Sequence, residues 1–182
     1  MRRPYIQSAI ADSVSILWRT DIGDQCKVGY KQQGETDWKF VSGVNRLTNT
    51  EVIENEVTLK NLTPNKTYEY QIFTNEKQLL EDNTFSFPSP VGPNDSIFSF
   101  FAVGDVGEPV EEAGTPDKLG EVLSLYKDSY HFGVLLGDII YPDGQSELYD
   151  SNLFQYFGGV FPYVPVFTIL GNHDWHEPEN NY

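Results

Sequence analysis

Three polar clusters in the second half of the sequence each follow an apolar run and each begin with glycine. They are Gly104-Asp105-Val106-Gly107, Gly137-Asp138-Ile139-Ile140-Tyr141 and Gly171-Asn172-His173-Asp174. Glycine lets the backbone turn sharply, so that the next side chain can lie close to a ligand. Two carboxylates, a phenol and an amide oxygen form a hard donor set that suits Fe(III), Mn(II) or Zn(II), usually completed by imidazole. Asp105, Asp138, Tyr141 and Asn172 are therefore candidate metal ligands.

The apolar runs before these clusters predict three strands, at residues 97–103, 132–136 and 164–170. A helix is expected between the first two, with Thr115 as its N-cap and Pro116 at its first position. Its predicted apolar stripe consists of Leu119, Val122, Leu123 and Tyr126. A second helical stretch carries Tyr149, Leu153, Tyr156 and Phe157 on one face.

Alternating strands and helices with buried-type strands indicate a parallel sheet covered by helices. In an open α/β sheet the carboxyl ends of neighbouring strands meet at one crevice, where ligands bind. We therefore expect Asp105, Asp138 and Asn172 to converge, although they lie far apart in the sequence.

The first half has a different periodicity. Apolar residues alternate with polar ones, as at Val14, Ile16 and Trp18, and turn signals separate the alternating runs. This pattern predicts an antiparallel β-sandwich from about residue 5 to about residue 85. The spacing from Leu62 to Tyr68 is typical of a tyrosine corner. Three prolines and a glycine in residues 86–96 predict a linker.

The composition restricts the possible partners. A formal net charge of −15 argues against nucleic acid, because nothing in the chain could neutralise a row of phosphates. No apolar run approaches the roughly 20 residues that a membrane helix needs. Cys26 is the only cysteine, which excludes an internal disulfide and a thiolate zinc cluster. The N-terminus has no apolar signal core, and the compartment and oligomeric state stay open.

The three clusters resemble the first three motifs of the calcineurin-like metallophosphoesterases, and with the preceding sandwich the chain resembles the front part of a purple acid phosphatase. Most metallophosphoesterases carry Asp-x-His in the first motif, whereas this chain has Gly107 in place of the histidine. Purple acid phosphatases have Asp-x-Gly there and supply a tyrosinate from Gly-Asp-x-x-Tyr, which Tyr141 matches. The resemblance covers both halves and implies a fibronectin type III-like domain (1–86), a linker (87–96) and an incomplete α/β catalytic domain (97–182).

The resemblance also implies the chemistry. It implies a dinuclear centre of Fe(III) and a divalent Zn, Fe or Mn ion that hydrolyses phosphate monoesters. Asp105 and Tyr141 would bind the ferric ion, Asp138 would bridge the two metals, and Asn172 would bind the divalent ion. His173 would lie over the substrate phosphate, stabilising the developing charge or protonating the leaving group. Members of the family are secreted or periplasmic.

The family pattern also requires a later histidine and a Gly-His-x-His motif, which this sequence does not contain. We therefore expect the 182 residues to be a fragment with little activity of its own. Two alternatives stay open: another metallophosphoesterase, such as a phosphodiesterase or nucleotidase, and a non-enzymatic binding module. His131 is expected at the surface or a strand edge, and nothing favours His176 as a ligand. The aromatic residues expected in the core are Tyr5, Trp18, Trp38 and Tyr70.

Overall fold

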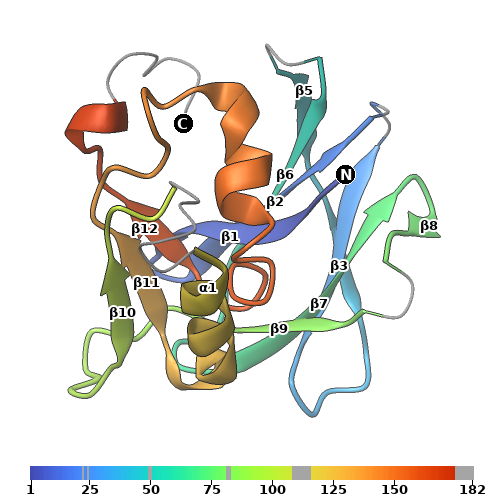
Figure 1. Ribbon diagram of the computed structural model, residues 1–182. Helices are drawn as coiled ribbons and strands as arrows, with labels where there is room; N and C mark the ends of the chain where they lie inside the picture. The colour runs from blue at the N-terminus through green and yellow to red at the C-terminus, as the bar shows by residue number, and fades with distance from the viewer. Residues whose placement is uncertain (22, 24, 49–50, 81–82, 108–115, 175–182) are drawn as a thin grey trace.

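The computed structural model describes residues 1–21, 23, 25–48, 51–80, 83–107 and 116–174. Its first half consists of two antiparallel sheets, and its second half is built on one parallel sheet (Figure 1). The prediction of an antiparallel first half and a parallel second half is confirmed. In the described part of the chain no helix is long and apolar enough to cross a membrane.

The first sheet of the sandwich has the strand order β1-β2-β6-β5. These strands span Arg2–Ile10 (β1), Ser13–Thr20 (β2), Ile53–Leu59 (β6) and Val44–Leu47 (β5). The second sheet has the order β4-β3-β7-β8, and β9 also pairs with β7. Its strands span Lys39–Ser42 (β4), Cys26–Gln32 (β3), Thr67–Thr74 (β7), Lys77–Gln78 (β8) and Phe85–Pro88 (β9).

The core between these sheets contains the residues that the alternation predicted. Val14, Ile16, Trp18 and Tyr70 are all fully buried there. The prediction is wrong for Trp38, which is half-buried in the connection between β3 and β4, where the Lys31 ammonium lies 5.2 Å from its ring centre. The predicted tyrosine corner is also present, because the backbone N–H of Thr63 donates a hydrogen bond to the Tyr68 hydroxyl at 2.9 Å. This bond fixes the chain where it enters β7.

Strand β9 includes Phe87 and Pro88, which the sequence analysis assigned to the linker. Phe87 is buried in the sandwich core, and Pro88 ends the strand. Proline is tolerated there because β9 pairs on one side only, with β7. The irregular segment therefore begins at Ser89.

The parallel sheet has the order β10-β11-β12, as Figure 1 shows beside β1. Its strands, Phe100–Val103 (β10), Phe132–Leu135 (β11) and Val166–Thr168 (β12), are shorter than predicted. The sheet was expected to be covered by helices, but one face is open in the described structure. Phe100 is 50% exposed and Phe167 is 37% exposed on that face. Apolar runs predicted the strands correctly, but hydropathy does not show what covers each face.

Helix α1 (Pro116–Leu125) begins at Pro116 as predicted, whereas Thr115 lies outside the described residues. The predicted stripe is wrong in part, because Val122 and Tyr126 are more than half exposed. The buried positions are Pro116, Gly120 and Leu123. A β-carbon on Gly120 would lie 2.2 Å from the Tyr156 carbonyl oxygen, so the helix packs through a close backbone contact.

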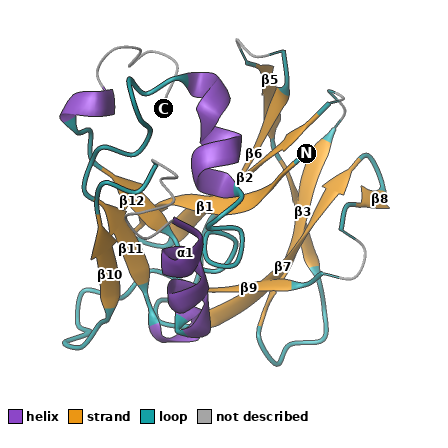
Figure 2. Cartoon of the chain, in the orientation of Figure 1, coloured by secondary structure: helices purple, strands orange, loops and turns teal. Residues whose placement is uncertain are grey.

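The second helical stretch comprises a 3₁₀ turn, η2 (Ser146–Leu148), and a π-helix, η3 (Asp150–Phe154), drawn as helix in Figure 2. Another 3₁₀ turn, η1 (Lys127–Ser129), follows α1. Leu153 and Phe157 are buried as predicted, and they share a second core with Tyr5 and Leu17 of the sandwich. The sandwich and the parallel sheet are therefore packed together through β1 and β2.

Two hydrogen bonds to backbone carbonyl groups reinforce the packing between the sandwich and the second half. The Ile6 N–H of β1 donates to the Phe161 carbonyl at 3.1 Å, and the Tyr70 hydroxyl donates to the Pro162 carbonyl at 2.8 Å. Both acceptors lie in the segment that leads into β12. The sandwich thus supports the strand that precedes the third polar cluster.

Candidate metal centre

The two candidate aspartates share an unusual backbone conformation. Asp105 follows β10 and Asp138 follows β11, and both have a positive φ, of 55° and 50°. Left-handed backbone is uncommon outside glycine and is concentrated at functional sites. The Asp105 N–H also donates to the Gly137 carbonyl at 3.2 Å, which places the two turns side by side. Both side chains therefore leave the sheet at the same edge.

Glycine is required where these turns meet. A β-carbon on Gly107 would lie 1.7 Å from the Ile139 carbonyl oxygen. A β-carbon on Gly171 would lie 2.2 Å from an Asp138 carboxylate oxygen. At both positions the obstacle is the neighbouring turn, so the clusters approach each other as closely as backbone permits.

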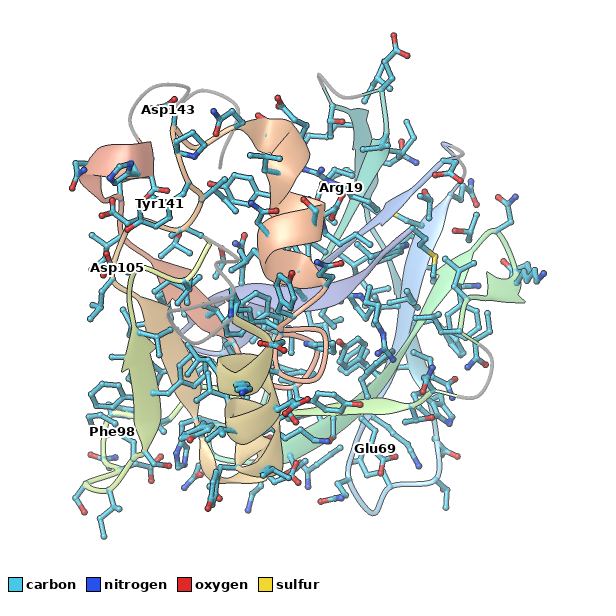
Figure 3. The ribbon with its side chains drawn as sticks, in the orientation of Figure 1. Arg19, Glu69, Phe98, Asp105, Tyr141 and Asp143 are labelled. Carbon is cyan, nitrogen blue, oxygen red and sulfur yellow. The ribbon has the colours of Figure 1, made fainter. Side chains whose placement is uncertain are left out.

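Tyr141 lies between the two aspartates. Its hydroxyl donates to Asp105 Oδ1 at 2.8 Å, and Asp138 Oδ2 lies 3.4 Å from the same oxygen. Figure 3 labels Asp105 and Tyr141, which lie together beyond the carboxyl ends of β10 and β11. Desolvation, the hydrogen bond to Asp105 and the charges of both carboxylates raise the pKa of the Tyr141 phenol well above its ordinary value.

The third cluster forms the 3₁₀ turn η4 (Asn172–Asp174) after β12. The His173 N–H donates to Asp138 Oδ1 at 2.9 Å, and the His173 ring centre lies 4.4 Å from that of Tyr141. His173 Nδ1 lies 2.6 Å from the Pro142 carbonyl oxygen. Because a carbonyl only accepts, Nδ1 carries the proton and leaves Nε2 as the other functional atom.

The exposed Asn172 precedes His173 in the same turn. Among the described residues its side chain has no hydrogen bond to Asp105, Asp138 or Tyr141. The structure thus brings Asp105, Asp138, Tyr141 and His173 into contact and leaves the Asn172 amide at their edge. His131 is half-buried at the start of β11, where its Nδ1 accepts the Ser99 N–H at 3.1 Å. His176 lies outside the described residues.

Sequence reasoning assigned no role to Asp174. Its carboxylate is fully buried and accepts backbone N–H groups from two of the three clusters. Its place directly after Asn172-His173 was visible in the sequence, but an aspartate at a strand end is ordinarily solvated, so nothing signalled its burial.

The chemistry of the donor set fits a hard cation. The Tyr141 phenol lies within hydrogen-bond distance of both carboxylates, and a cation bound there would take the place of the phenol proton. Within the described ranges no three His, Cys, Asp or Glu side chains come together as a ligand group, so the phenol is needed to bring the number of close donors to three.

Comparison with known proteins identifies both halves of the chain. Residues 3–88 match the profile of the purple acid phosphatase N-terminal domain, and residues 98–182 match that of the calcineurin-like phosphoesterases. No curated protein sequence matches the chain.

Two solved structures share the fold. A purple acid phosphatase from yellow lupin (Lupinus luteus) has a TM-score of 0.74 at 16% identity, and the match covers 93% of this chain and 35% of that one. A protein named PhoD has a TM-score of 0.58 at 14% identity, covering 91% and 38% of the two chains. The chain thus spans little more than a third of the length of these structures. Residues 3–88 thus belong to the purple acid phosphatase N-terminal domain family, and residues 98–182 belong to the calcineurin-like phosphoesterases.

Proposed function

We propose that this chain supplies one side of a dinuclear metal centre that hydrolyses phosphate monoesters. The observation that carries the proposal is the Tyr141 hydroxyl, which lies 2.8 Å from Asp105 and 3.4 Å from Asp138. Three oxygens that can each become anionic are thereby held around one point. Such a group is costly to keep together without a cation, which favours a metal-binding role.

The proposed roles follow from donor type and position. Asp105 and the Tyr141 phenolate would hold Fe(III), and Asp138, which lies between Tyr141 and the η4 turn, would bridge to a divalent Zn, Fe or Mn ion. Asn172 would bind the divalent ion after a rotation of its exposed amide. When bound, two such metals generate hydroxide near neutral pH and stabilise charge on phosphoryl oxygens.

We assign His173 to the substrate. Its backbone N–H and Nδ1 are already engaged by Asp138 and Pro142, so the ring has one orientation and presents Nε2. Nε2 can donate to a phosphate oxygen, or to the leaving oxygen, when the imidazole is protonated. Because its partners are fixed, this group needs little reorganisation on substrate binding.

Gly107 favours the tyrosinate type of site over the phosphodiesterase and nucleotidase alternative. That alternative expects a histidine ligand at position 107, but any side chain there would meet the Ile139 carbonyl at 1.7 Å. The close approach of the two turns excludes a histidine without rebuilding the loop. A non-enzymatic binding role gains no comparable support, because it leaves the strained aspartates unexplained.

We also propose that the sandwich is of the fibronectin type III kind, ending at Pro88, with a linker at 89–96 and the catalytic part from residue 97. The tyrosine corner at Tyr68 supports the first point, and the pairing of β9 with β7 supports the boundary.

The metal assignment is tested by titrating the chain with Fe(III) and recording its visible absorbance. Wild type is expected to develop a tyrosinate-to-iron charge-transfer band. Tyr141→Phe should lose the band, and Asp138→Ala should lose metal binding. Tyr126→Phe, which removes an exposed phenol of the same half, is the matched control and should keep the band. A band that survives in Tyr141→Phe would refute the tyrosinate assignment.

Hydrolysis is tested in a chain extended through the later histidine ligands that the family pattern implies. Such a chain should cleave a phosphate monoester such as p-nitrophenyl phosphate at acidic pH, and in preference to a diester. His173→Ala should lower kcat while metal content stays unchanged. Preferential cleavage of the diester would favour the phosphodiesterase alternative.

A further inference from the structure

Asp174 carries a carboxylate in an unusual setting. It is fully buried at the end of η4, and it accepts three backbone hydrogen bonds. Oδ1 accepts the N–H of Ile139 at 2.9 Å and that of Ile140 at 3.3 Å, while Oδ2 accepts the N–H of Gly171 at 2.9 Å. A buried carboxylate is stable only when its oxygens are satisfied in this way.

The three donors belong to two different strand ends. Ile139 and Ile140 follow Asp138 directly, in the turn after β11, and Gly171 directly precedes Asn172, in the turn after β12. The Asp174 carboxylate thus joins the backbone that directly follows Asp138, the proposed bridging ligand, to the backbone that directly precedes Asn172, the proposed ligand of the divalent metal.

A second contact between the same two turns further restricts the distance between them. The His173 N–H donates to Asp138 Oδ1 at 2.9 Å, and the absence of a side chain at Gly171 leaves just enough room for that carboxylate. A small sliding of one turn along the other would break all of these bonds at once. The position of Asp138 relative to η4 therefore has little freedom.

We infer that Asp174 is a positioning residue that sets the separation of Asp138 from Asn172 and His173, and hence the geometry of the metal centre. The inference rests on the proposed function for its consequence, though the hydrogen bonds stand without it. Losses in the shell that supports metal ligands typically reduce affinity by about 10–100-fold.

The substitution Asp174→Asn tests the inference with almost no change in volume. The NH₂ group of the asparagine would replace one carboxylate oxygen and would point its N–H groups at a backbone N–H. Either the two hydrogen bonds from Ile139 and Ile140 or the one from Gly171 must therefore be lost. Glu54→Gln is the matched control. Glu54 is also a buried carboxylate with satisfied oxygens, bonded by Tyr5 and Arg19 at the contact between the two halves, but it touches no candidate ligand.

Two measurements on the metal-free and Mn²⁺-titrated chain separate the possibilities. In Asp174→Asn, amide hydrogen exchange should accelerate at least about tenfold at the amides that lose their acceptor, either Ile139 and Ile140 or Gly171, beyond any change in global unfolding. Mn²⁺ affinity should fall about 10–100-fold. Glu54→Gln should leave both unchanged at matched global stability. If Asp174→Asn does not fold, Asp174→Glu carries the test, because it keeps two oxygens and displaces them by one methylene.

Unchanged exchange at the three amides would overturn the inference. Accelerated exchange with unaltered Mn²⁺ affinity would also overturn it, because Asp174 would then only stabilise the fold. If wild type binds no Mn²⁺ while exchange accelerates in the variant, the proposed metal function fails and the structural connection through Asp174 stands.

Discussion

Replacing Gly107 with alanine tests the close approach on which the site geometry depends. The new β-carbon would lie 1.7 Å from the Ile139 carbonyl oxygen, 2.5 Å from its carbon and 2.8 Å from the Ile140 α-carbon. Real β-carbons do not approach within 3.0 Å, so the turn after Asp105 must separate from the turn after Asp138 by about 1.3 Å. The obstacle is backbone, which cannot rotate away.

We expect the free energy of unfolding to fall by about 2–3 kcal/mol, the upper part of the range for overpacking. Because the displacement moves Asp105 away from the turn that carries both Asp138 and Tyr141, the distance from Asp105 to the Tyr141 hydroxyl should also grow, and Fe(III) affinity should fall. Gly107→His should be at least as destabilising, and should not recover binding by supplying an imidazole.

Gly104→Ala is the matched control, because Gly104 is the glycine that directly precedes Asp105 in the same turn. Its β-carbon would lie 3.4 Å from the Leu136 β-carbon and 3.7 Å from the Gly137 carbonyl oxygen, which are ordinary contacts. A change within about 1 kcal/mol is expected there. Urea unfolding followed by circular dichroism measures both variants. If Gly107→Ala and Gly104→Ala unfold at the same urea concentration, the two turns do not meet as described and the argument against a histidine at position 107 fails.

Three further predictions concern the scaffold. Tyr68→Phe should lower the free energy of unfolding by about 1–2 kcal/mol in urea unfolding, because the Thr63 N–H loses its acceptor. Burial raises the pKa of the Tyr70 phenol above its value in the unfolded chain. The free energy of unfolding should therefore be constant below about pH 9 and should fall as the pH rises past about 10, by up to about 1.4 kcal/mol per pH unit. Tyr70→Phe should make this fall of the unfolding free energy with pH shallower. Phe100→Ser should reduce concentration-dependent light scattering, because it removes an exposed ring from the open sheet face, whereas equal scattering would show that this face does not drive association.

Local sequence determined the elements of this protein. Period-two alternation around Val14, Ile16 and Trp18 could produce only a strand with one face in a core, and the predicted sandwich followed. Apolar runs ending in Gly-Asp predicted where β10 and β11 stop, since a strand ends where glycine and a left-handed aspartate reverse the chain. These signals lie within a few residues, so they can be recognised without knowledge of the fold.

Contacts between distant segments decided the rest. Leu17 appears on the outward face of its strand, yet it is buried, because the second half packs against that face. Gly120 carries no hydropathy signal, but the close approach of the Tyr156 carbonyl made it the centre of the buried side of α1.

The site shows the same division. Residue types and strand ends identified Asp105, Asp138 and Tyr141 as candidates, whereas their separation of a few ångströms depends on parallel pairing over more than thirty residues. The need for glycine at position 107 and the burial of Asp174 both arise from one turn pressing on another. Periodicity describes one element at a time, so contacts of this kind are decided only when the strands pair.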